Sequence, residues 1–162
     1  MKKEGKNIAY IDGANLYKGI FSLGWRLDYR RFRIWMEEKY NVQKVYLFIG
    51  FVSKYKELYT YLQESGFTLV FKETIKDCDG EVKGNCDADL VLKVVRDVYE
   101  KQNDFQIVLV SGDGDYASLV KFLQEKNKIR VVLSPNNKCS VLIKRTNVKI
   151  TYLDTQEKIL SA

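Results

Sequence analysis

Hydrophobic residues gather along the chain in short runs without polar residues at alternate positions. Such runs are typical of parallel strands, because helices cover both faces of a parallel sheet. Between the runs, hydrophobic residues recur at spacings of three and four, as they do on one face of a helix. The pattern predicts strands at residues 7–11, 44–51, 67–71, 107–110, 128–133 and 148–153.

The expected helices are bounded by polar residues and glycines. Asp28 and Ser53 are placed to cap helices that follow them, because their side-chain oxygens can accept first-turn N–H groups. Gly24 and Gly66 are placed to end helices. A polar stretch at 72–84 is expected to form a loop or a small hairpin. The helices are expected at residues 16–23, 29–39, 53–64, 90–101 and 139–144, with one more that contains Leu119, Val120 and Leu123.

Strands that alternate with helices predict an α/β fold with a doubly wound, mainly parallel sheet of five or six strands and helices on both faces. Two of the strand-to-helix turns are acidic. Asp12 follows the first strand, while Asp113 and Asp115 follow the fourth. If these acids share a pocket, the first and fourth strands must be neighbours, which gives the order 3-2-1-4-5. Ligands of open α/β sheets bind at such a switch point, at the carboxyl ends of the strands.

Each acidic position also has a purely structural interpretation. Asp115 is placed to cap the helix that follows it. Asp87 is expected in the first turn of another helix, where the helix dipole favours a carboxylate. Two independent strand–aspartate–helix turns in one small chain nevertheless favour a shared acidic pocket over unrelated caps.

The composition narrows the chemistry. The chain has 162 residues, of which 46% are hydrophobic, and we expect one globular domain over residues 1–162. It has no histidine, which excludes Ser-His-Asp and Cys-His catalysis. Three scattered cysteines favour a reducing cytosol over a disulfide framework. No run is long enough to span a membrane, and the N-terminus lacks the apolar core of a signal peptide, so a cytoplasmic location without membrane contact is expected.

Four carboxylates are the candidate metal ligands: Asp12, Asp87, Asp113 and Asp115. If they converged without a cation, their repulsion would force some of them to protonate. Oxygen ligands without histidine or thiolate favour Mg²⁺ or Mn²⁺ over zinc. Such an ion suits phosphodiester hydrolysis, because it lowers the pKa of a bound water and neutralises transition-state charge. Asn15 could orient a water or one of the ligand carboxylates.

The formal net charge of +6 permits a polyanionic partner. If the acids gather in one pocket, the rest of the surface is more basic than this number suggests. We expect salt-sensitive binding of a single strand through lysine–phosphate contacts. The candidates are Lys72, Lys76, Lys83 and Lys138. A second basic cluster, made of Arg26, Arg30, Arg31 and Arg33, is interpreted as a solvated helix face rather than a phosphate site.

Three motifs resemble those of the NYN domains, a branch of the PIN-like metal-dependent nucleases that includes the LabA-type bacterial proteins. They are YIDGAN at 10–15, KGNCDADLVL at 83–92 and VSGDGDY at 110–116. The resemblance implies that Asp12, Asp87, Asp113 and Asp115 occupy the acidic metal-binding positions, and that Asn15 is their polar partner. It also implies Mg²⁺- or Mn²⁺-dependent cleavage of RNA. Asp89 is an additional acid that could replace Asp87 as the ligand.

Three other interpretations compete with a ribonuclease. A non-cleaving RNA-binding or adaptor domain could use the same fold, although this chain keeps all the carboxylates that cleavage needs. A Toprim-like domain also has a DxD at a strand end but expects glutamate where Asp12 stands. A Rossmann nucleotide binder expects a GxGxxG that residues 111–116 lack. The sequence leaves open RNA against DNA, endo- against exonucleolytic cleavage, and the oligomeric state, for which a homodimer is one option.

Overall fold

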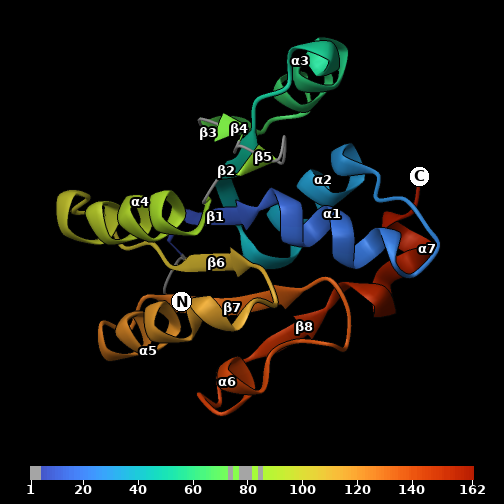
Figure 1. Ribbon diagram of the computed structural model, residues 1–162. Coiled ribbons are helices and arrows are strands. Elements are labelled where there is room, and N and C mark those ends of the chain that lie inside the picture. The colour runs from blue at the N-terminus through green and yellow to red at the C-terminus, as the bar shows by residue number, and fades with distance from the viewer. Residues whose placement is uncertain (1–4, 73–74, 77–81, 84–85) are drawn as a thin grey trace.

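The computed structural model describes the backbone of residues 5–72, 75–76, 82–83 and 86–162, and the side chains of residues 5–72 and 87–162. Its centre is a six-stranded, all-parallel sheet in the order β3-β2-β1-β6-β7-β8 (Figure 1). This order confirms the predicted one, with the last strand added at the edge. The strands are β1 Asn7–Asp12, β2 Val42–Gly50, β3 Thr68–Lys72, β6 Ile107–Val110, β7 Ile129–Ser134 and β8 Ile150–Tyr152.

Helices cover both faces of the sheet, as expected, and each face has its own hydrophobic core. On β1, Ala9 and Ile11 face the core built with α1 and α2, while Ile8 and Tyr10 face the core built with α4 and α5. Both faces of the strand are therefore apolar, which explains the uninterrupted hydrophobic runs. The helices are α1 Gly13–Phe21, α2 Tyr29–Tyr40, α3 Lys56–Glu64, α4 Cys86–Glu100, α5 Ala117–Glu125, α6 Val141–Lys144 and α7 Glu157–Leu160.

The adjacency of β1 and β6 positions the candidate site. Their register pairs Ile8 with Ile107 and Ile11 with Val110, so the two strands end side by side. The turns that follow them therefore begin at the same edge of the sheet, which is the arrangement that the acidic turns predicted.

The polar stretch at 72–84 contains a small antiparallel hairpin. Its strands are β4 Ile75–Lys76 and β5 Val82–Lys83, which confirms the hairpin among the two predicted options. Asp79 and Gly80, a residue pair typical of a turn, lie outside the described residues, as does the cysteine Cys78. Within the part of the chain that the structure describes, no helix is both long and apolar enough to cross a lipid bilayer.

The predicted cap at Asp28 is confirmed, the predicted cap at Ser53 is wrong, and the alternative interpretation of Asp115 as a cap does not hold. The Asp28 side chain caps α2 by accepting the N–H of Arg31, as expected. Ser53 is not a cap, because it begins a short 3₁₀ helix, Ser53–Tyr55, that precedes α3. Asp115 is not a cap either. A 3₁₀ turn, Gly114–Tyr116, precedes α5, and Asp113 caps that turn instead. In both cases the sequence did not reveal the extra 3₁₀ turn.

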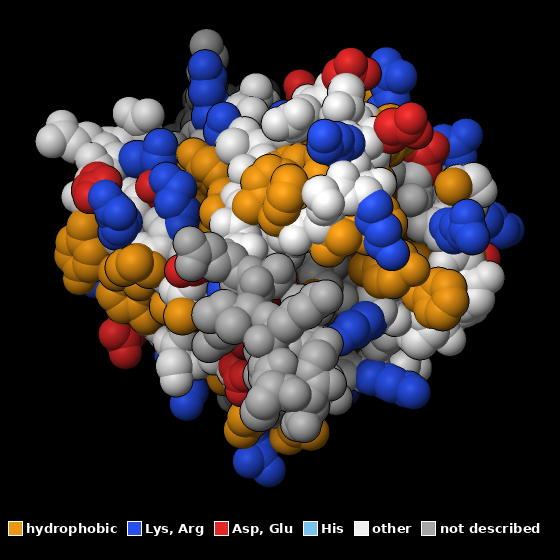
Figure 2. All heavy atoms as spheres, turned by 45° about the horizontal axis from the view of Figure 1, so that its top comes forward, with side chains coloured by type: hydrophobic (Ala, Val, Ile, Leu, Met, Phe, Trp, Pro, Cys, Tyr) orange, Lys and Arg blue, Asp and Glu red, His pale blue; other side chains and the backbone are white. Residues whose placement is uncertain are grey.

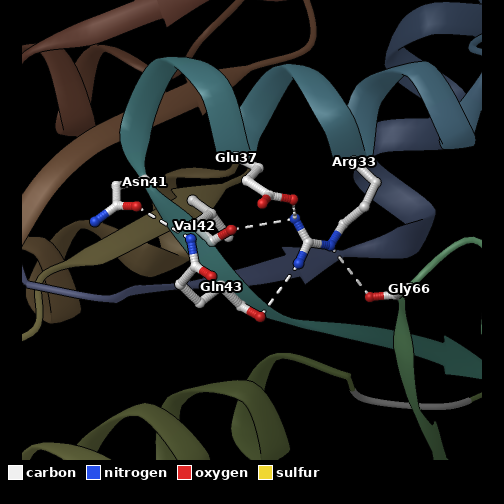
Figure 3. A network of polar contacts seen from close by, with 6 residues as sticks. All are labelled: Arg33, Glu37, Asn41, Val42, Gln43 and Gly66. Atoms are coloured by element: carbon white, nitrogen blue, oxygen red, sulfur yellow. Dashed lines mark hydrogen bonds and ion pairs between the residues drawn. The ribbon is translucent and has the colours of Figure 1, made fainter.

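The arginine cluster is not simply a solvated helix face. Arg33 lies on α2 and donates hydrogen bonds to three backbone carbonyl oxygens, at 3.1 Å to Val42, 3.2 Å to Gln43 and 3.3 Å to Gly66 (Figure 3). It also forms an ion pair with Glu37 at 3.6 Å. The guanidinium thereby connects α2 to the start of β2 and to the turn before β3, which is a structural role.

We expect Arg33→Ala to lower the free energy of unfolding by about 2 kcal/mol, because three carbonyls lose a charged donor. Arg96→Ala is the matched control, since the one polar partner of the Arg96 side chain among the described residues is Glu100, at 3.5 Å, with both side chains 62% exposed. An exposed pair of this kind contributes less than about 1 kcal/mol. Urea denaturation measures both values, and equal losses would contradict the structural role of Arg33.

Candidate functional site

Asp12, the last residue of β1, also caps the helix that follows it. Its side chain is 4% exposed, and its Oδ1 accepts the backbone N–H of Asn15 at 3.1 Å, which caps α1. The next residue must be glycine, because a Cβ on Gly13 would lie 2.8 Å from the carbonyl oxygen of Phe48. The helix can therefore begin directly at the strand end, and this close approach fixes the Asp12 carboxylate at the edge of the sheet.

The turn after β6 is fixed by side-chain hydrogen bonds. The Oγ of Ser111 accepts the N–H of Asp113 at 3.1 Å, and the Oδ1 of Asp113 accepts the N–H of Asp115 at 2.9 Å. The side-chain carbonyl of Asn15 accepts the N–H of Gly112 at 2.9 Å. Asn15 thus connects the two acidic turns directly, and its side-chain oxygen is engaged in that contact.

Tyr116 connects the two turns to α4. Its side chain is fully buried, and its hydroxyl lies 3.1 Å from Oδ2 of Asp12 and 2.9 Å from Oδ1 of Asp87. The hydroxyl has one proton, so it donates to both carboxylates in a shared hydrogen bond. Burial, followed by the charge of Asp12, raises the pKa of Tyr116, and the group stays protonated as a donor.

The sequence did not reveal Tyr116 as a residue of the site. It lies within the VSGDGDY motif, but a tyrosine after two acids looks like any core aromatic residue. Its role depends on tertiary contacts, because its partners are 29 and 104 residues away along the chain.

One carboxylate oxygen each from Asp12, Asp87 and Asp113 lies within 4.8 Å of the others. Burial raises the pKa of Asp12, and the charges of Asp87 and Asp113 raise it further, while hydrogen bonds from Asn15 and Tyr116 act in the opposite direction. A divalent cation among these oxygens would remove the electrostatic cost of the group. Oxygen donors alone are the set that Mg²⁺ and Mn²⁺ accept, so the residues fit such an ion.

The other acidic candidates lie beside this group rather than in it. The Asp115 side chain is fully exposed, and the charge of Asp113 is the main cause that raises the pKa of Asp115. Asp89 lies in the first turn of α4, as Asp87 does, but its side chain is exposed and outside the close group. Of these two α4 residues, Asp87 is the one that the structure brings to Asp12 and Asp113. A ligand role for Asp115 stays a prediction.

The predicted phosphate-binding lysines lie in different environments. Lys72 ends β3, and its Nζ is buried without a hydrogen-bond partner among the described residues. The side chains of Lys76 and Lys83, on the hairpin strands, lie outside the described residues. Lys138 is exposed and lines a polar pocket beside Asn15. Figure 2 shows one face of the molecule, where basic side chains are spread widely and acidic ones are fewer.

Comparison with known proteins agrees with both the fold and the motifs. The sequence profile described as the NYN domain matches residues 7–154, which include all of the acids described above. A crystal structure of a protein of unknown function from Vibrio parahaemolyticus is similar, with a TM-score of 0.79, 22% sequence identity and 99% of each chain covered. At this identity the likeness shows the fold alone. No curated protein matches the sequence significantly.

Proposed function

Because the chain belongs to the NYN domain family, a family of PIN-like nucleases, we propose that it is a metal-dependent endoribonuclease acting on single-stranded RNA. One observation carries the proposal. Three carboxylates from three separate elements, β1, α4 and the turn after β6, bring oxygen atoms within 4.8 Å of one another. The caps and the Tyr116 hydrogen bonds stabilise these side chains one by one, but they do not remove the repulsion between three close carboxylates, which a cation would remove.

Asp12, Asp87 and Asp113 would hold Mg²⁺ or Mn²⁺, and Asp115 would join them directly or through water. The ion would supply a bound water of lowered pKa and neutralise charge on the pentacovalent phosphate. The protein's own contribution is to fix the carboxylates. Backbone N–H groups orient Asp12 and Asp113, and the Tyr116 hydroxyl orients Asp12 and Asp87. Asn15 acts by keeping the two turns together.

The test uses circular single-stranded RNA and circular single-stranded DNA of matched sequence, incubated with Mn²⁺, Mg²⁺ or EDTA. Only an endonuclease can open a circle, so we expect linear products from the RNA in either metal and none in EDTA. Binding of the RNA without any cleavage would favour the alternative, a non-cleaving RNA-binding or adaptor domain. Equal cleavage of both circles would contradict the proposed preference for RNA over DNA.

A further inference from the structure

A polar pocket of about 270 Å³ lies beside the acidic group, between α1 and the loop that follows β7. Its wall nearest the acids is formed by Asn15 and Gly112, which are hydrogen-bonded to each other at 2.9 Å. Lys18 from α1 and Lys138 from the loop also line the pocket. Among the described residues that line the pocket, none is an aspartate or a glutamate.

The loop that carries Lys138 is fixed against α1. The Asn136 side chain is 9% exposed. It donates to the carbonyl oxygen of Gly19 at 3.0 Å and accepts the N–H of Lys138 at 2.9 Å. A Cβ on Gly19 would lie 2.5 Å from Cβ of Pro135, so a larger residue would push the loop away from the helix. The position of Lys138 over the pocket is therefore set by the fold and not by a free loop.

Neither lysine forms an ion pair within the described part of the chain. Lys18 and Lys138 are both exposed, and neither ammonium has an ion pair or a hydrogen bond with another described residue. Lys93, in contrast, forms an ion pair with Asp97 at 3.0 Å. If the pocket lysines served only to neutralise the acidic group, they would contact its carboxylates. They line the neighbouring pocket instead, together with Asn15 and Gly112.

A nucleic acid strand explains this arrangement. The acidic group repels phosphates wherever no cation intervenes, so a strand that crosses it needs positive charge beside it. Lysine is a common phosphate ligand and acts as a point charge. We propose that Lys18 and Lys138 bind a phosphate group of the substrate strand next to the phosphodiester at the acidic group. This proposal depends on the proposed function in one respect only, which is that the phosphodiester at the acidic group is the one that is cleaved.

The first test is the salt dependence of RNA binding, measured by fluorescence anisotropy in EDTA, where no cleavage occurs. Each phosphate contact with a single strand contributes about 0.7 to the slope of log K against log salt. Because both lysines bind one phosphate, the double variant Lys18→Gln/Lys138→Gln should lose about 0.7 of the wild-type slope. The control Lys121→Gln/Lys158→Gln removes the same charge from exposed positions on α5 and α7, and it should keep the slope. A pocket variant that behaved like the control would overturn the proposal.

The second test is cleavage in Mn²⁺. The pocket variant should show a higher KM and a nearly unchanged kcat, because the contact stabilises the bound substrate and the transition state equally. Its melting temperature should rise with Mn²⁺ as in the wild type, since the acids are untouched. RNA with a 5′-phosphate and with a 5′-hydroxyl separates two sources of the phosphate. A preference for the 5′-phosphate that the variant loses indicates a terminal phosphate, and no effect of the end group indicates an internal one.

The two proposals fail separately. If the wild type shows no cleavage, and the salt slope of RNA binding still depends on Lys18 and Lys138, the phosphate pocket is supported and the nuclease assignment is refuted. If the wild type cleaves RNA and the pocket variant matches the control in both slope and KM, the nuclease stands and the phosphate pocket is refuted.

Discussion

Asp113→Asn should reduce metal-dependent cleavage by more than the 10–100-fold that is typical of changes to residues around a metal site. Without metal, the variant should be at least as stable as the wild type, and up to about 1 kcal/mol more stable. The reason lies in the two roles of Asp113. Asparagine caps helices as well as aspartate does, so the cap on the N–H of Asp115 is kept. The variant removes only a charge, and that charge raises the pKa of Asp12.

Thermal melts in EDTA and in Mn²⁺ measure this prediction. The wild type should be stabilised by Mn²⁺, because the ion binds the folded state preferentially, and Asp113→Asn should be stabilised much less. Asp113→Ala is the control for the cap. It should lose the Mn²⁺ effect and also about 0.5–2 kcal/mol of stability in EDTA. If Asp113→Asn kept the full Mn²⁺ shift, Asp113 would not be a metal ligand.

Most of the sheet could be predicted because helices cover both of its faces. The strands are then visible as apolar runs, and the shared chemistry of two acidic turns required β1 and β6 to be neighbours. The match to the NYN family also decides against the Toprim-like and Rossmann interpretations. The sequence also predicted that Asp12 and Asp113 lie together, because the carboxyl ends of adjacent parallel strands meet at one edge of the sheet.

What could not be predicted depends on contacts between distant segments. Arg33 belongs to a run of basic residues that looks solvent-facing, but its partners are carbonyl oxygens whose positions are set by β2 and by the turn before β3. Lys18 lies in an ordinary helix position, and only the approach of the loop after β7 makes it part of a pocket. No periodicity or spacing within one segment contains this information.

Tyr116→Phe should lower the free energy of unfolding of the metal-free protein by about 1–3 kcal/mol at pH 7, because two carboxylates lose their shared donor. The hydrogen bond lowers the pKa of Asp12, so its loss should raise that pKa further. When a carboxyl group has a higher pKa in the folded than in the unfolded protein, the protein loses stability as the pH rises through the folded-state pKa. The deficit should therefore shrink in mild acid, where Asp12 is protonated.

Mn²⁺ should recover most of this deficit, because the cation replaces the hydroxyl proton as the positive charge between Asp12 and Asp87. Tyr10→Phe is the matched control. Tyr10 is also fully buried, and it donates to the buried carboxylate of Asp97 at 2.6 Å, on the core face of α4 and away from the acidic group. Its deficit should be similar in size and unaffected by Mn²⁺. Denaturant unfolding of both variants, each in EDTA and in Mn²⁺, makes the comparison. If Mn²⁺ left the Tyr116→Phe deficit as large as that of Tyr10→Phe, then Asp12 and Asp87 would not share a cation, and Tyr116 would serve the fold alone.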